Sequence, residues 1–173
     1  MLCRRLVLVL TVAAMRSEFH ISILIGLDSS VIQSLLTAIH KDYFELVSYR
    51  ELLFNDFGDR VAQLLHVRSL VPFPLNEKQI VQQEVLIVNT HLLFPHDSSL
   101  SIARLHQVYK ILEYLEAYQK EKKLSHIPII LCGDWNGSKR GHVYKFLRSQ
   151  GFISSYDVAQ QLKKNQEPLE MLV

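Results

Sequence analysis

Two apolar runs enclose a long segment of helical character, and this order limits the folds open to the chain. Residues 85–91 and 127–133 are short, apolar and bounded by polar residues, which predicts two buried strands. Between them, residues 100–122 carry apolar side chains at three- and four-residue steps, which predicts a helix. The apolar stripe of this helix is expected to contain Ile102, Leu105, Val108, Tyr109, Leu112 and Leu115. Strand, helix and strand in this order predict a βαβ unit with parallel strands, and hence an α/β fold.

Both predicted strands end in polar side chains two residues apart. Asn89 and His91 close the first strand, and Asp134 and Asn136 follow the second. Since alternate residues of an extended chain point to the same side, each pair is expected on one side of its strand. Parallel strands also end at the same edge of a sheet. His91, Asp134 and Asn136 are therefore predicted to meet in a crevice outside the carboxyl ends of the strands.

These residue types suit acid–base chemistry, and each also has a structural alternative. Asp134 could hold a water molecule or accept its proton, Asn136 could donate to a developing oxyanion, and His91 could contact a phosphate or protonate a leaving group. Alternatively, Asp134 and Asn136 form an Asx turn after the strand, and His91 is a hydrogen-bonded core histidine. Asn89 is more typical of a structural hydrogen-bonding residue than of a catalytic one.

The rest of the chain is predicted from turn signals and short apolar runs. Strands are expected over 35–40 and 61–67, a turn over 55–59, a surface loop over 72–83, and a second helix over 142–150 that stops at Gly151. With 173 residues, 49% of them hydrophobic, the chain is long enough to bury a core as one globular domain.

The charge of the chain is nearly balanced, at +2, which excludes a polycation that binds through its overall charge. The basic residues are unevenly distributed, however. Between Gly137 and Gln150 the chain has four basic residues and no acidic one, namely Lys139, Arg140, Lys145 and Arg148. Such a local field suits a phosphate-bearing ligand. A solvated loop and helix face is the alternative interpretation.

The first residues have the pattern of a secretory signal. Arg4 and Arg5 precede an apolar run, so residues 1–14 show the basic and apolar regions of such a signal. Alternatively, these residues form a buried strand or a poorly ordered leader. Of the two locations, an intracellular one is favoured for this protein over a secreted one. The run is too short to span a bilayer, so no transmembrane span is predicted. The two cysteines, Cys3 and Cys132, make no disulfide framework, and Cys132 is interpreted as a small buried hydrophobe.

Several familiar motifs are excluded by their spacing. The loop from Gly133 to Arg140 is glycine-rich and basic but does not have the spacing of a P-loop. Asp134 and Asn136 could open a calcium loop, yet Lys145 stands at position twelve, where a bidentate glutamate is needed. Ser138 lacks the flanking glycines of a nucleophile elbow. The sequence contains no His-Glu-x-x-His zinc motif and no paired Cys-x-x-Cys.

The remaining motifs resemble a known superfamily. Val88-Asn-Thr-His-Leu92 and Ile129-Ile-Leu-Cys-Gly-Asp-Trp-Asn136, with Arg104 and Gln107 in the helix between them, resemble the endonuclease/exonuclease/phosphatase (DNase I-like) superfamily. The segments 50–66 and 137–147 are similar in particular to its plant members described as calcium-binding, whose longer forms carry EF-hands. The resemblance runs from about Leu35 to Tyr156. No EF-hand pattern occurs in this sequence, so calcium binding is not expected here.

The resemblance implies a fold and a reaction. The fold is a four-layer α/β sandwich, present here in part, with two packed mixed sheets and flanking helices. The reaction is Mg²⁺-dependent hydrolysis of phosphoesters, expected to be of nuclease type and to act on nucleic acid or a related phosphodiester. By the match of motifs, Asp134 would orient or deprotonate the attacking water, Asn136 would steady the phosphate or the nucleophile, and His91 would bind the scissile phosphate. The residues expected to contact the substrate are Asn89, Lys139, Arg140 and His142.

Two parts of the superfamily pattern are missing from the sequence. These are a metal-binding glutamate after an early strand and a closing Asp-His pair near the end, so no metal ligand is assigned. Residues 1–34 and 158–173 are interpreted as divergent segments on either side of a partial domain at 35–157, truncated at both ends. Two functions stay open: a metal-dependent phosphoester hydrolase, and a non-catalytic truncated form that binds phosphate ligands or a partner.

Overall fold

The chain contains eight strands and three helices within the residues that its structure describes. The computed structural model describes residues 5–7, 23–26, 35–55, 60–71, 83–94 and 100–166. The elements, in chain order, are β1 (Arg5–Val7), β2 (Ile23–Gly26), β3 (Leu36–Ile39), β4 (Phe44–Leu53), β5 (Val61–Ser69), β6 (Glu84–His91), α1 (Leu100–Glu121), β7 (Ile129–Asp134), α2 (His142–Ser149), β8 (Phe152–Ser154) and α3 (Ser155–Gln166). The predicted α/β class is confirmed.

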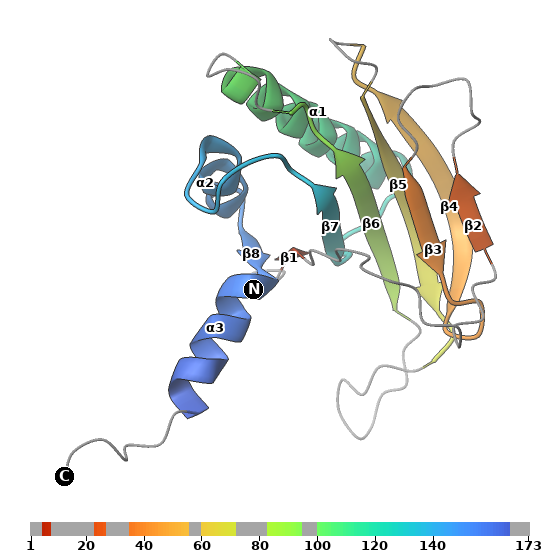
Figure 1. Cartoon of the computed structure of the whole chain (residues 1–173). Helices are drawn as coiled ribbons and strands as arrows, with labels where there is room; N and C mark the ends of the chain where they lie inside the picture. Colours follow the sequence, from red (N-terminus) through yellow and green to blue (C-terminus); the bar gives the residue numbers. More distant parts are fainter. Residues whose placement is uncertain are drawn as a thin grey trace.

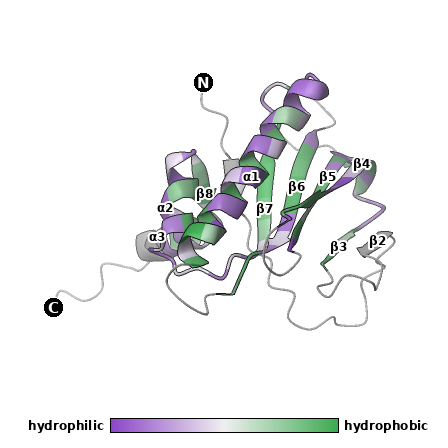
Figure 2. Ribbon diagram, turned by 90° about the horizontal axis from the view of Figure 1, so that it is seen from above, coloured by the Kyte–Doolittle hydropathy of each residue, from purple (hydrophilic) through white to green (hydrophobic). Residues whose placement is uncertain are grey.

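The strands form one large mixed sheet and one small antiparallel sheet. The large sheet has the order β4-β5-β6-β7-β1-β8, antiparallel from β4 to β6 and parallel from β6 to β8. The small sheet pairs β2 with β3. Helix α1 covers one face of the large sheet, and the small sheet lies on the opposite face (Figures 1 and 2). The described residues thus form part of the expected sandwich of two sheets with helices on the outside.

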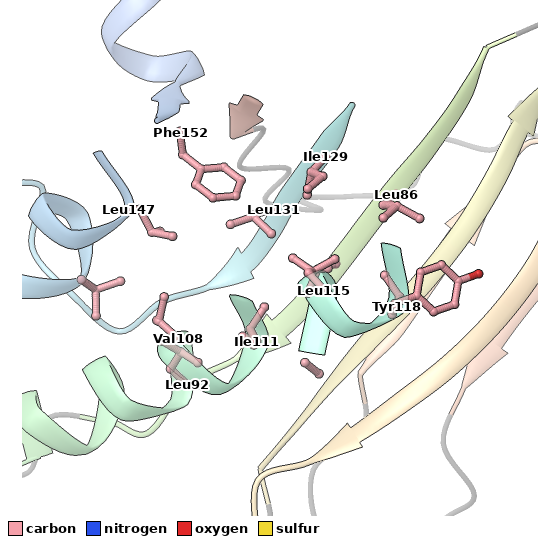
Figure 3. Packing of buried hydrophobic residues seen from close by; sticks show 14 of the residues in the cluster. Leu86, Leu92, Val108, Ile111, Leu115, Tyr118, Ile129, Leu131, Leu147 and Phe152 are labelled. Atoms are coloured by element: carbon pink, nitrogen blue, oxygen red, sulfur yellow. The ribbon is translucent and has the colours of Figure 1, made fainter. Parts of the chain in front are cut away.

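The predicted βαβ unit is present as β6, α1 and β7. The two strands are parallel neighbours, and their register runs from Leu86 opposite Ile129 to His91 opposite Asp134. Side chains from both strands pack under the helix in the main core, where Leu131 lies near Ile111 and Leu115 (Figure 3). Leu86, Leu92 and Leu131 are fully buried there. Burial of one face of each element therefore fixes the two strand ends side by side.

The buried face of α1 differs from the predicted stripe. Val108 and Leu115 are buried as expected, but Ile102 is 75% exposed and Tyr109 is 54% exposed, so these two assignments were wrong. The residues that α1 buries are Arg104, Gln107, Val108, Ile111, Leu115 and Tyr118. Two of these are polar and bind the chain that follows β6. Hydrophobic periodicity counts only apolar residues, so it placed the contact face too far around the helix.

Strand β4 was not predicted, although it is ten residues long. Its pairing with β5 shifts between Leu46 and Ser48, which marks a β-bulge. A bulge adds one residue to one strand, so the apolar and polar positions change sides in the middle of the pattern. Neither half of β4 is long enough to give a clear alternation by itself. The predicted strands 35–40, 61–67 and 85–91 and the helix 142–150 do correspond to β3, β5, β6 and α2.

The small sheet is held on the large one by apolar and polar contacts. Ile39 of β3 packs with Leu65, Val67 and Val85 of the large sheet. Beside this cluster, the fully buried Gln63 accepts a hydrogen bond from the Thr37 hydroxyl at 2.7 Å. The same side chain donates to the Leu35 carbonyl at 3.1 Å. These bonds satisfy a polar group that would otherwise destabilise the interior.

Some predictions about segment boundaries and loops are not tested by the described residues. Helix α3 crosses the boundary predicted after residue 157, and that boundary stays a prediction. Most of the signal-like segment 1–14, of the turn 55–59 and of the loop 72–83 lies outside the described residues. Among the helices that the structure describes, none combines the length and the apolar character that crossing a membrane requires.

Glu84 gives the stability of the sheet a dependence on pH. Its carboxylate accepts hydrogen bonds from Arg68 at 2.9 Å and contacts His66 at 3.1 Å, and these partners, Arg68 first, lower the pKa of Glu84. A carboxyl whose pKa is lower in the folded state stabilises it above the unfolded pKa and loses this contribution as the pH falls through the folded pKa. We expect wild-type stability to fall below about pH 4.5, and to fall less in Glu84→Gln.

Urea unfolding at several pH values between 7 and 3 measures this difference. Glu113→Gln, on the exposed face of α1, is the matched control, and its free energy of unfolding should depend on pH as that of the wild type does. If the free energy of unfolding of Glu84→Gln falls with pH as steeply as that of the wild type, Glu84 is not the source of this pH dependence.

Candidate active site

His91 and Asp134 lie opposite each other at the carboxyl ends of β6 and β7. In β6, Leu86 and Val88 point into the core under α1, whereas Val85 and Asn89 contact the small sheet. Alternation places His91 on the side of the small sheet. Its Nε2 is 3.9 Å from Oδ2 of Asp134, and the two side chains are 39% and 65% exposed. The structure therefore places these two side chains next to each other, as expected from the strand order, and their roles stay predictions.

Asp134 and Asn136 form the Asx turn that was considered as an alternative. The backbone N–H of Asn136 donates to Oδ1 of Asp134 at 2.9 Å. The Asn136 side chain donates from Nδ2 to the Leu92 carbonyl at 2.8 Å, and Leu92 donates its own N–H to the Asp134 carbonyl at 2.9 Å. The turn therefore joins the ends of β6 and β7. It occupies one carboxylate oxygen of Asp134 and leaves Oδ2 on the side of His91.

Gly133 allows the two strand ends to approach this closely. Its φ is +114°, in the region that favours glycine. A Cβ at this position would lie 1.9 Å from the carbonyl oxygen of Thr90 and 2.8 Å from its nitrogen. Thr90 is the register partner of Gly133, one step before the pair of His91 and Asp134. The geometry of the pair thus depends on the missing side chain of Gly133.

The surroundings of His91 favour its neutral form. Burial is the main cause that lowers the pKa of His91, and the positive charge of Arg60 acts in the same direction. The nearby Asp134 carboxylate opposes both. A neutral imidazole carries one N–H donor and one acceptor nitrogen. At neutral pH, His91 can therefore donate one hydrogen bond to a ligand oxygen and accept another at its second ring nitrogen.

The distance between His91 and Asp134 leaves room for a ligand atom. At 3.9 Å the two side chains are too far apart for a direct hydrogen bond. Polar groups separated in this way are commonly bridged by a water molecule. A water or a phosphate oxygen between the groups could accept from the imidazole, and a water could also donate to the carboxylate. The arrangement can therefore hold a water molecule, as a nucleophile, next to a phosphate group.

The basic residues predicted to bind substrate lie in different places. The Lys139 ammonium contacts Asp157 at 3.2 Å and Gln160 at 3.0 Å. Arg140 is exposed in the loop before α2. His142 is the first residue of α2 and, with Arg104, lines a cavity of about 300 Å³ between α1 and that loop. The structure does not gather these three side chains around His91, and their roles in binding stay predictions.

Comparison with known proteins adds to this geometry. The chain is 87% identical over 127 residues to a protein of Arabidopsis thaliana named as an uncharacterized calcium-binding protein, which covers 73% of this chain and 26% of that protein. It is 29% identical over 111 residues to Carbon catabolite repressor protein 4 homolog 3 of the same plant, covering 62% and 22%. It is 31% identical over 91 residues to human Protein angel homolog 1, covering 52% and 13%. The chain belongs to the endonuclease/exonuclease/phosphatase superfamily.

Two further comparisons complete this result. The human Nocturnin catalytic domain with bound sulfate is similar at 21% identity and a TM-score of 0.49, over 66% of this chain and 38% of that one. No protein-family model matches the chain. The chain spans about a quarter or less of the length of the three curated relatives.

The donor atoms at the site meet only part of what a magnesium ion needs. Mg²⁺ prefers oxygen ligands and is usually held by one or two carboxylates, waters and substrate phosphates. Oδ2 of Asp134 is one such oxygen. Within the described ranges, no group of three or more His, Cys, Asp or Glu side chains is placed to hold a metal. For this member of the endonuclease/exonuclease/phosphatase superfamily, the described residues do not make a complete magnesium site.

Sequence reasoning missed the residues that support the site from below. Asn89 donates from Nδ2 to the Leu36 carbonyl at 3.2 Å and to the Thr37 hydroxyl at 3.0 Å, which is the structural role considered for it. Thr37 in turn donates to Gln63. Thr37 belongs to no motif, and Gln63 lies in the similar segment 50–66 but was assigned no role there. Their only signal in the sequence is a polar residue inside an apolar strand, as at Gln63 in β5.

The chain after His91 is tied to α1 in a similar way. Leu93 donates its N–H to Oε1 of the buried Gln107 at 3.1 Å. Its carbonyl accepts from Arg104 at 3.4 Å. Arg104 and Gln107 were part of the superfamily resemblance, and these contacts give a physical reason for their presence. They hold the segment that carries the strand end against the helix.

Cys132, the register partner of Asn89, is expected to be a slow thiol. Burial raises the pKa of Cys132 to about 11. Since the thiolate is the reactive form, at pH 8 we expect disulfide reagents to modify folded Cys132 more slowly than an ordinary thiol of pKa about 8.5, by a factor on the order of a hundred. The rate of reaction with Ellman's reagent in a Cys3→Ser variant measures this, with the urea-unfolded chain as the reference. Equal rates would contradict the interpretation of Cys132 as an inert side chain.

Proposed function

We propose that this chain is a phosphoester hydrolase of nuclease type, which cleaves phosphodiesters with an activated water. The observation that carries the proposal is the pair of His91 and Asp134, exposed at adjacent strand ends with their side chains 3.9 Å apart. Membership of the endonuclease/exonuclease/phosphatase superfamily supports the same reaction class. Nucleic acid is the preferred substrate class because a polymer carries phosphates beyond the one that is cleaved, and the segment 137–150, although its side chains do not gather around His91, carries only basic charges.

The side chains divide the work as follows. Asp134 accepts a proton from the attacking water through Oδ2, while Oδ1 stays bound to the Asn136 N–H. As the water oxygen bonds to phosphorus, the bond between phosphorus and the leaving oxygen breaks, and the leaving oxygen takes a proton from solvent water. The neutral His91 donates to a non-bridging phosphate oxygen, where negative charge increases during attack. Asn136 has one side-chain N–H engaged by Leu92, and its second N–H is a donor for the phosphate. Magnesium enters the proposal through the superfamily, and no step here depends on it.

A second function is favoured by one observation. Asp134 is the one carboxylate that the described residues place beside His91. A site with a single carboxylate suits the alternative of a form that binds phosphate ligands without turnover. Both functions use the same side chains, so only a measurement of turnover separates them.

The test is a hydrolysis assay with parallel binding. Single-stranded RNA, single-stranded DNA and bis-p-nitrophenyl phosphate are incubated with the chain in Mg²⁺ or in EDTA, and product release is followed. Release that requires the Asp134 carboxylate supports the hydrolase. Binding of the same oligonucleotides without any release supports the second function. Release that does not change when this carboxylate is removed contradicts the proposed role.

A further inference from the structure

A cavity of about 380 Å³ lies on the side of the large sheet opposite to His91. It is bounded by the loop after β7, by α2, by β8 and by the start of α3. Val143, Leu147 and Phe152 make its apolar part and belong to the core that α1 covers. In Figure 3, Phe152 lies beside Leu131 and Leu147. The volume falls in the range of small-molecule sites, about 300–1,000 Å³.

Aromatic side chains characterise the lining. Trp135, Tyr144 and Tyr156 all line the cavity. Aromatic walls of this kind suit a flat ring that can stack on them.

Two cations line the cavity, and one carboxylate lies beside them. Lys139 and Arg148 belong to the lining, whereas Asp157, which contacts Lys139 at 3.2 Å, is not among the described residues that line it, so one net positive charge remains. Lys139 uses its ammonium to contact Asp157 and Gln160, and lies 4.3 Å above the ring of Tyr156. Arg148 donates from Nη1 to the Phe152 carbonyl at 3.0 Å. An ammonium has three N–H groups and a guanidinium has five, so both retain donors beyond these contacts. An anionic group is therefore matched at this end of the cavity.

We propose that the cavity binds a mononucleotide unit, with the base against Trp135 and the tyrosines and the phosphate at Arg148 and Lys139. A nucleotide combines a flat ring and an anion, which are the two features that the lining complements. Base stacking on aromatic side chains and charge-assisted bonds to phosphate are both strong contributions to binding. The inference rests on the proposed function for its choice of ligand class, and it adds a second place where that class is bound.

Trp135 also provides the test, because it is the single tryptophan of the chain. Its fluorescence is followed while the full chain, in EDTA, is titrated with AMP, with adenosine or with inorganic phosphate. We expect a saturable change with AMP, a weaker affinity for adenosine, and no saturable change with phosphate alone. Arg148→Gln should weaken AMP by about tenfold, the loss of one charge-assisted bond, and should leave adenosine unchanged. Lys145→Gln, on the same helix but outside the cavity lining, is the matched control and should bind AMP like the wild type.

The outcomes separate this proposal from the proposed function. If Arg148→Gln still binds adenosine, its cavity is intact. Lys139→Gln is the second variant, to be used if Arg148→Gln does not fold. The proposal is overturned if AMP gives no saturable change, if phosphate alone gives the same change, or if both variants bind AMP as tightly as the wild type. The titration needs no hydrolysis, so it tests the cavity separately from the reaction. AMP binding by a chain without turnover would support the nucleotide site and contradict the proposed hydrolase. Turnover without AMP binding would contradict the nucleotide site and leave the hydrolase supported.

Discussion

Asp134→Asn is expected to lower phosphodiester hydrolysis by a factor on the order of 10² to 10⁴, which is the contribution of a positioned general base. The variant keeps an oxygen that can accept the Asn136 N–H, so the Asx turn that joins β6 and β7 remains. The oxygen that faces His91 is the one that changes, because an amide nitrogen there cannot accept a proton. Asp134 is 65% exposed, so stability should hardly change.

Steady-state kcat and KM on bis-p-nitrophenyl phosphate measure this effect. A loss in kcat with little change in KM is the expected pattern, because water activation acts in the transition state. Glu113→Gln removes an exposed carboxylate from α1 and should retain full activity. Urea unfolding of both variants tests that the fold is intact. An unchanged kcat/KM in Asp134→Asn would remove this carboxylate from the mechanism.

The second large effect is expected at Gly133, where alanine should destabilise the chain by about 2–6 kcal/mol from backbone strain and overpacking, at about 1–3 kcal/mol each. The added Cβ would lie 1.9 Å from the Thr90 carbonyl oxygen, which is far inside van der Waals contact. The clash involves backbone on both sides, so no side-chain rotation relieves it. If the strands separate to accommodate the methyl group, His91 and Asp134 separate with them and activity falls as well.

Two other glycines provide matched controls for this variant. Gly151 has φ +85°, but a Cβ there would meet nothing within 4 Å, so Gly151→Ala measures strain without a clash. At Gly137 the nearest atom would be the Trp135 carbonyl at 3.5 Å, an ordinary contact, so Gly137→Ala should have little effect. The midpoints of urea unfolding should rank Gly137→Ala above Gly151→Ala and Gly133→Ala last. A loss at Gly133 no larger than that at Gly151 would contradict the role of close approach.

The site pair was predictable because it depends on order along the chain. Apolar runs at 85–91 and 127–133 around a helical segment leave little choice except parallel neighbouring strands, and these strands must end together. The positions of His91 and Asp134 then follow, because both stand at the strand ends and the parallel pairing of Leu86 with Ile129 sets the two strands in register. The Asx turn of Asp134 and Asn136 could also be foreseen, since it is a local contact.

Other features could not be obtained in this way. The bulge between Leu46 and Ser48 is defined by the pairing of β4 with β5, so it reversed the pattern of β4 without a local signal. Ile102 and Tyr109 fit the helical period, yet both are exposed because α1 turns Arg104 and Gln107 toward Leu93. The cavity beside Trp135 likewise forms from elements far apart in the chain.

The spacing of apolar and polar residues thus defines the βαβ unit, the class of fold and the strand ends where His91 and Asp134 stand. Folding adds which oxygen of Asp134 faces the imidazole, which face of α1 is buried, and how Thr37 and Gln63 support Asn89. The physical reason is the range of the interactions. Periodicity is a property of neighbours in sequence, whereas the partner of a buried polar group can lie anywhere along the chain, as Thr37 and Asn89 show at 52 positions apart.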